Sequence, residues 1–260
     1  MTQDTSLDIA HAAMEASDDD AARLRFYDRL AEAELFLLLD GEPTGETVDP
    51  RVFDTEEGRF VLAFDREHRL TDFTGDIAPY AALSGRVLSG LLAAEGLGLG
   101  LNLGVAPSSI LIPADAVAWL AGTLAEGPGE VEARPVELSP PGRVPEALVL
   151  SLDSKLATAR GLARFAYLAT ARYENGAEAH LLAFIDPVPG AEPALSRAAH
   201  EALVFSGVEA GEMDVGFFRA SDPMAANLAR VALRFDIPPA PETEGPAAPG
   251  MDPDRPPRLK

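Results

Sequence analysis

The sequence predicts an α/β, α+β-like protein with two small mixed-sheet domains, flanking helices and a disordered proline-rich C-terminal tail. Three observations support this fold class. Apolar residues in the stretch Ala82–Leu124 change from helical spacing to strict alternation and back again. The pair Asn175-Gly176 lies between two runs typical of strands and is a strong hairpin signal. The stretch 126–144 is rich in glycine, proline and charge, as expected of a boundary between domains.

Composition limits the classes of function that the chain can have. It has 260 residues, 47% of them hydrophobic, a formal net charge of -21 and no cysteine. The missing cysteines exclude disulfides, thiolate chemistry and cysteine-based zinc sites. The negative charge repels phosphate backbones and anionic lipid, and no apolar run reaches the roughly 18 residues that span a bilayer. We therefore expect a cytoplasmic protein that binds neither nucleic acid nor membranes. The protein partner that we expect and the absence of a cofactor rest on the features described below.

The N-terminal residues predict two helices, a buried strand and a hairpin. Ser6–Ala16 has a helical apolar pattern. The run Asp18–Asp20 precedes a second helix, and we interpret it as the cap of that helix because it lacks the other acids of a calcium loop. A buried strand, the two strands of a hairpin and a short helix or turn follow at 35–39, 52–55, 59–64 and 66–73.

The stretch Ala82–Leu124 predicts a helix, a stop, a strand, a turn, a second strand and a helix. Gly85 and Ser89 share one face of the first helix, which is small enough for another backbone to approach closely. Gly96 predicts a left-handed stop. The other face of this first helix is apolar and is expected to be buried. It consists of Leu83, Val87, Leu88, Leu91 and Leu92. The last elements are a strand at 109–112 and a helix from Pro113 with Trp119 at the edge of its apolar face.

Between these helices, Leu97–Leu103 alternates leucine with small residues, so one face of the predicted strand is nearly bare. A helix, another backbone or a ligand would lie flat against such a face. A phosphate-binding loop is disfavoured, because the third glycine of the dinucleotide motif is replaced by leucine and no helix follows directly. Two interpretations stay open, namely close packing inside the protein and a partner-binding face. The bare face consists of Gly98, Gly100, Asn102 and Gly104.

The second half repeats this order of elements without an obvious repeat in sequence. A short edge strand is expected at 131–138, where Pro135 would prevent a central position. Helices, each beginning at a proline, are expected from Pro145 to Gly161, from Pro193 to Phe205 and from Pro223. Strands are expected at 165–173, 179–185, 214–219 and 231–235.

These elements divide the chain into five expected segments. They are an N-terminal helix and loose segment at 1–20, a first α/β domain at 21–125, a linker at 126–144, a second α/β domain at 145–237 and a disordered tail at 238–260.

The sequence contains no motif for catalysis, cofactor binding or metal binding, and we assign no residue to any of these roles. The four histidines are scattered, and His180, in a predicted strand, is the best candidate for a functional imidazole. Ser108 and Ser109 follow a turn proline and are expected to bond the local backbone. Lys155 lacks a serine at the spacing of a lysine-activated nucleophile. A site assembled from distant residues stays open.

Several stretches of the sequence resemble a known family. FYDRLAEAELFLLL at 26–39, VFDTEEGRFVLAF at 52–64, LSGRVLSGLLAAEGLGLGLNLG at 83–104 and APSSILIPADAVAWL at 106–120 resemble the N-terminal domain of the SseB family, named for enhanced serine sensitivity. LARFAYLATARY, HLLAFIDP and DVGFF in the second half resemble the C-terminal domain that often follows it. The resemblance implies a bacterial, cytoplasmic, non-enzymatic protein that acts on serine or sulfur metabolism through a partner. It supplies no catalytic residues to carry over.

Two functional hypotheses follow. In the first, the chain is an interaction or regulatory protein, and the glycine-faced strand Leu97–Gly104 around Asn102, or an adjoining groove, receives a partner segment. In the second, the chain is a small-molecule sensor or an enzyme with a pocket between the domains that gathers His180, Tyr167 or Arg164. A purely structural role is the third possibility.

Overall fold

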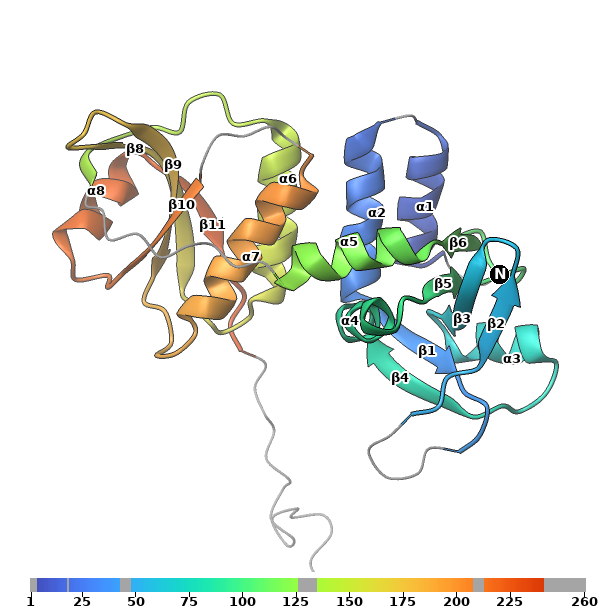
Figure 1. Cartoon of the computed structure of the whole chain (residues 1–260). Helices are drawn as coiled ribbons and strands as arrows, with labels where there is room; N and C mark the ends of the chain where they lie inside the picture. Colours follow the sequence, from blue (N-terminus) through green and yellow to red (C-terminus); the bar gives the residue numbers. More distant parts are fainter. Residues whose placement is uncertain (1–3, 18, 43–47, 126–134, 208–212, 241–260) are drawn as a thin grey trace, which may run out of the picture.

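The structure, a computed structural model, describes residues 4–17, 19–42, 48–125, 135–207 and 213–240 (Figure 1). These residues form eight helices and eleven strands, and the strands make one sheet of six and one of five. Both sheets are mixed, which confirms the predicted fold class. Residues 241–260 of the expected disordered tail lie outside the described residues. We call the elements around the two sheets the first and second units, and their division into domains stays a prediction.

The first sheet has the strand order β4-β1-β3-β5-β6, with β2 beside β3. Only β3 and β5 run parallel, and the other pairs are antiparallel. The predicted buried strand, hairpin and following strands are confirmed. The strands are β1 (Glu34–Leu38), β2 (Val52–Thr55), β3 (Gly58–Phe64), β4 (Tyr80–Ser84), β5 (Gly98–Leu101) and β6 (Ile110–Ile112).

Strand β4 is absent from the sequence prediction, which began a helix at Ala82. The helix instead begins at Gly85, and the Ser84 hydroxyl accepts a hydrogen bond from Val87 N at 3.3 Å. Alanine and leucine at positions 82 and 83 favour a helix by propensity. Pairing along β1 overrides that preference, because strand formation depends on neighbours more than on the residue itself.

Four helices cover one face of the first sheet and one short helix covers the other (Figure 1). The face under the four helices holds the larger core, which includes Leu35, Leu37, Val61 and Leu99. On the opposite face, Leu70 of the short helix packs against Leu38 and Phe64. The four helices are α1 (Ser6–Glu15), α2 (Asp20–Glu32), α4 (Gly85–Glu95) and α5 (Ala114–Ala125), and the short helix is α3 (Glu67–Thr74).

The glycine predictions for α4 are confirmed at both of its ends. A Cβ added at Gly85 would lie 1.8 Å from the Leu30 carbonyl oxygen, so only glycine allows α2 to approach this closely. Gly96 ends the helix with φ 63°. The predicted apolar face is wrong in part, because Val87 and Leu91 are 49% and 47% exposed.

The small face of β5 is filled by the protein's own side chains. A Cβ added at Gly98 would lie 2.5 Å from the Phe60 ring, and one added at Gly100 would lie 2.5 Å from Leu62 and 2.8 Å from Leu103. All four residues of β5 are buried. Of the two interpretations left open by the sequence, the structure therefore shows close internal packing.

The second sheet has the order β10-β9-β8-β11, with β7 beside β8. Helices α6 and α7 pack on one face and α8 on the other. The hairpin at Asn175-Gly176 is confirmed, with φ 80° at Gly176. The elements are β7 (Pro135–Ser139), α6 (Glu146–Thr158), β8 (Phe165–Tyr173), β9 (Glu178–Ile185), α7 (Glu192–Phe205), β10 (Met213–Phe218), α8 (Pro223–Val231) and β11 (Leu233–Asp236).

The two units pack directly on each other through α7. Phe205, its last residue, is buried within the core of the first unit and lies edge-on to Trp119, with ring centroids 6.5 Å apart. Gly207 follows it, and a Cβ there would lie 2.9 Å from Ala21 of α2. The contact between the units is therefore solid and includes shared core.

Candidate functional site

A buried charge network lies inside the first unit. Arg69 of α3 reaches Asp8 of α1 at 2.5 Å and Asp65, just after β3, at 2.8 Å. Thr5 caps α1 and its hydroxyl donates to Asp65 Oδ2 at 2.6 Å. Although burial opposes ionisation, the Arg69 guanidinium and the Ser108 hydroxyl hold the pKa of Asp8 well below its usual range. We call this set the Asp8 network.

Two residues singled out in the sequence, Asn102 and Ser108, belong to the Asp8 network. Asn102 has φ 49°, accepts a hydrogen bond from Asp65 N at 3.1 Å and donates to Ser108 Oγ at 2.9 Å. Ser108 donates to Asp8 Oδ1 at 2.6 Å, so its expected role in the local backbone is wrong. Ser109 does bond locally, by accepting from Gly104 N. The network fills the carboxyl ends of parallel strands β3 and β5, where α/β proteins often bind ligands.

A second network joins the two units. Lys155 of α6 is 2% exposed, and its Nζ lies 2.5 Å from Asp28, 2.7 Å from Glu32 and 3.1 Å from Glu201. Arg86 of α4 donates two hydrogen bonds of 2.8 Å to the Glu201 carboxylate. We call this set the Lys155 network. It links α2 and α4 of the first unit to α6 and α7 of the second.

The surroundings of the Lys155 network shift the pKa values of its members. Burial lowers the pKa of Lys155, but Asp28 and Glu32 reverse this and hold it above its usual range. Burial likewise opposes ionisation of Glu201, yet Arg86 and Lys155 hold its pKa below the usual range. Burial raises the pKa of Asp28 despite the nearby ammonium. Lys155 is therefore held as a cation by three carboxylates.

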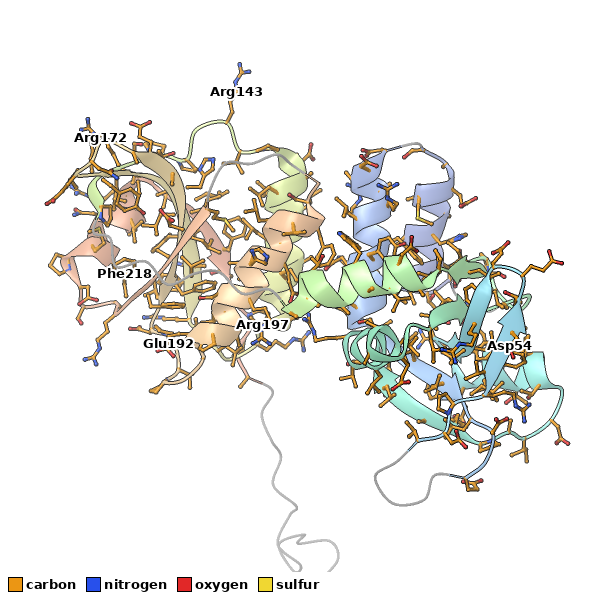
Figure 2. The ribbon with its side chains drawn as sticks, in the orientation of Figure 1. Asp54, Arg143, Arg172, Glu192, Arg197 and Phe218 are labelled. Carbon is orange, nitrogen blue, oxygen red and sulfur yellow. The ribbon has the colours of Figure 1, made fainter. Side chains whose placement is uncertain are left out.

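A groove of about 220 Å³ opens over the Lys155 network between the units. Arg197 of α7 lies at this groove, where the second unit faces the first (Figure 2). The groove floor is occupied by charges that already have partners, since Lys155 and Arg86 both bind Glu201.

The structure does not bring together the three residues of the second hypothesis. His180 pairs with Thr170 in the register of β8 and β9, whereas Tyr167 pairs with Ala183, so the two side chains lie on opposite faces of the sheet. Among the described residues, His180 Nδ1 has no hydrogen-bond partner. Arg164 is exposed and lies over the Phe165 ring. The expected gathering at an interdomain pocket is wrong.

Other candidates from the sequence have ordinary structural roles. Asp19 caps α2 by accepting from Ala21 N, as predicted for the aspartate run, while Asp18 lies outside the described residues. His11 is buried edge-on against Phe26. Within the described part of the chain, no group of three or more His, Asp or Glu side chains is placed to hold a metal ion. None of the described helices combines the length and hydropathy needed to cross a bilayer.

The edge strands of the sheets differ in how they are protected against pairing with other chains. In the second sheet, β7 begins with a proline, contains a register irregularity and carries Glu137. β10 carries Asp214, whose carboxylate accepts from the Tyr173 hydroxyl at 2.5 Å. β11 carries Arg234 and Asp236. In the first sheet β2 carries Asp54, and β6 has only 3 residues (Figure 2). Prolines, charged residues, bulges and short length are the features that protect an edge strand from pairing with a strand of another chain.

Strand β4 has none of these protective features. Its sequence, YAALS, contains no charge and no proline, and its register on β1 is regular. It ends the strand order of the first sheet and forms an outer margin of the first unit (Figure 1). Among the described residues, no strand pairs with its other side.

The register of β4 determines which backbone groups face outward. Leu39 N donates to the Pro79 carbonyl, and Gly85 N donates to the Ala33 carbonyl. Because hydrogen-bonded pairs alternate in an antiparallel ladder, Ala81 and Leu83 bond to β1, and the N–H and C=O groups of Tyr80 and Ala82 point away from it. These outward groups can accept an added strand.

Within the part of the chain that the structure describes, the fold and this edge define a mixed α/β module whose strand β4 is an unprotected sheet edge. Residues 7–119 match the family model described as SseB protein N-terminal domain. The matched segment runs from α1 into α5 and includes β4. The first unit is therefore similar to SseB N-terminal domains, and the resemblance of the second half to the C-terminal domain stays a prediction. No curated protein and no solved structure matches the chain.

Proposed function

We propose that the chain is a non-enzymatic interaction module that binds an extended segment of a partner protein along the free edge of β4. The observation that carries this proposal is the lack of edge protection in β4, in contrast to β2, β6, β7, β10 and β11. Strand addition gains affinity from main-chain hydrogen bonds, which the outward groups of Tyr80 and Ala82 can supply.

The buried charges support an interaction role more than a catalytic one. Asp8, Arg69, Lys155 and Glu201 are each held by a group of opposite charge. A catalytic acid or base needs a pKa near the working pH, whereas these partners move the pKa values of Asp8 and Lys155 away from neutrality. A bacterial, cytoplasmic setting and a link to serine or sulfur metabolism follow from the family resemblance and belong to this proposal.

The first test uses a proline placed at an outward backbone group. Ala82→Pro removes the outward N–H, and proline is tolerated on the solvent side of an edge strand. Ala82→Gly keeps that N–H, adds no bulk at the edge and, like proline, is unfavourable in a strand, so it is the matched control. Tagged wild type and both variants are purified from the native host at near-physiological salt, and co-purifying proteins are quantified by mass spectrometry after thermal denaturation has shown that the variants fold.

We expect wild type and Ala82→Gly to retain a common partner that Ala82→Pro loses. Hydrogen exchange of the complex should then show slowed exchange of the Tyr80 and Ala82 amides. An identical set of companions in all three samples, with unchanged exchange at these amides, would contradict strand addition at β4.

A further inference from the structure

The surface beside β4 combines apolar and aromatic side chains. Ile77, three residues before the strand, is 95% exposed, and Phe73 of α3 is 38% exposed. Phe36 and Tyr80 are half-buried and meet edge to face, with ring centroids 5.3 Å apart. Ile77 is a large apolar side chain that contributes little to the core, and it lies at the start of the free edge.

The side chains on this face of the sheet follow from the register. Phe36 pairs with Ala82 and Leu38 pairs with Tyr80, so these residues share one face with Glu34, two positions before Phe36. Ala82 is small and exposed. No bulky side chain of β4 therefore stands between the outer edge and the Phe36 ring at this position.

The charge on this surface is negative. The nearby Glu67 carboxylate raises the pKa of the Tyr80 hydroxyl, and Glu34 raises it further. Glu34 lies on the same face of β1 as Phe36, and Glu67 is near enough to Tyr80 to act on its hydroxyl. Carboxylates next to aromatic faces are the pairing that attracts an arginine or lysine side chain.

We propose that the segment bound by β4 is cationic, with arginine or lysine on the face shared by Phe36, Tyr80 and Glu34. This inference rests on the proposed function of the β4 edge. Neighbouring strands are spaced about 4.8 Å apart, so an added strand would lie about 10 Å from β1. An arginine side chain on that strand can cross Ala82 and reach the Phe36 ring and the Glu34 carboxylate.

The whole chain favours the same partner chemistry. Its formal net charge is -21, so a cationic segment is attracted from a distance and an anionic one is repelled. This long-range attraction acts on any cation. The proposal concerns the local carboxylates, and the experiment must therefore separate the two effects.

Three synthetic peptides serve as probes, in which valine alternates with arginine, with glutamine or with glutamate. Their affinities are measured by titration calorimetry at about 0.15 M salt, where charges beyond about 8 Å are largely screened. The proteins are wild type, the double variant Glu34→Gln/Glu67→Gln, and the matched variant Glu56→Gln/Glu57→Gln. The matched variant changes the same charge at the exposed turn between β2 and β3. Ala82→Pro tests the edge itself.

We expect wild type to bind the arginine peptide about tenfold more tightly than the glutamine peptide, and the glutamate peptide least. Glu34→Gln/Glu67→Gln should reduce that preference at least about threefold, while Glu56→Gln/Glu57→Gln leaves it unchanged. Ala82→Pro should abolish binding of both the arginine and the glutamine peptides.

The peptide titrations distinguish a failure of the cationic preference from a failure of strand addition at β4. Equal binding of the arginine and glutamine peptides, with both lost in Ala82→Pro, would overturn the cationic preference and leave strand addition intact. Undiminished binding of the arginine peptide to Ala82→Pro would overturn strand addition, since the attraction would then come from net charge. Equal losses in the two glutamine variants would overturn the role of Glu34 and Glu67, and no binding of any peptide would overturn the inference.

Discussion

The Asp8 and Lys155 networks are both buried, but they join different parts of the molecule. The Asp8 network ties α1, α3 and the ends of β3 and β5 within the first unit. The Lys155 network ties α2 and α4 to α6 and α7 across the boundary between the units. Arg69 has two carboxylates around it, and Lys155 has three. Buried ion pairs therefore hold elements together within one unit and also join the two units.

Of the changes considered, removal of the Lys155 ammonium should have the largest effect on the free energy of unfolding. Lys155→Met leaves Asp28 and Glu201 buried beside each other without their shared cation, so we expect a loss of about 3–5 kcal/mol in the free energy of unfolding at neutral pH. Urea unfolding measures it, and part of the loss should return in acid as the carboxylates take up protons. Arg23→Met, on an exposed pair, is the control and should change stability by less than about 0.5 kcal/mol. A fully stable Lys155→Met protein would show that the contact does not depend on this charge.

Weakening the Asp8 network should have a smaller and more local effect. Asp8→Asn removes one carboxylate from Arg69, which keeps Asp65, so we expect a loss of about 2 kcal/mol. Hydrogen exchange should speed up in α1 and leave α6 and α7 unchanged. Faster exchange throughout both units would instead mean that the two networks are one cooperative element.

The stability that Asp8 contributes to the folded protein should depend on pH. The folded-state pKa of Asp8 is below its unfolded value, so its contribution is fully present above about pH 5 and is lost as pH falls below about pH 4. The stability difference between wild type and Asp8→Asn should therefore shrink as pH falls from about 7 to about 3. Urea unfolding across this range tests the sign, and a difference that grows in acid would contradict it.

The smallest effect is expected at the solvent side of the Lys155 network. Glu32 is 22% exposed, and its loss leaves Lys155 with Asp28 and Glu201. Glu32→Gln should therefore cost less than about 1 kcal/mol in urea unfolding. A loss as large as that of Lys155→Met would mean that the network needs all three carboxylates.

Elements with a local signal could be predicted from the sequence. Gly96 and Asn175-Gly176 set backbone conformations on their own, and prolines begin or precede several helices. Strand β4 was missed because its pairing with β1 joins residues distant in sequence. Gly98 and Gly100 were recognised as unusual, but only the neighbouring Phe60 and Leu62 show that the space beside them is filled.

The buried networks could not be predicted from local patterns. Asp8 and Arg69 are 61 residues apart, and Asp8 and Ser108 are 100 apart. One signal was present for Lys155, which is the only lysine before Lys260 and lies beside Leu148, Leu152 and Leu156 on the apolar stripe of its helix. A lysine on such a stripe indicates burial with partners. It does not reveal which carboxylates those partners are.

The charge of the chain has a consequence for the kinetics of association at the β4 edge. An unprotected edge can pair with the same edge of another copy. Two copies that each carry -21 repel one another, which slows their encounter, whereas a cationic segment is steered toward the protein. The net charge thus slows self-association and speeds association with a cationic segment, so the β4 edge stays available for the partner. This difference between the two association rates becomes smaller as added salt shortens the range of the electrostatic field.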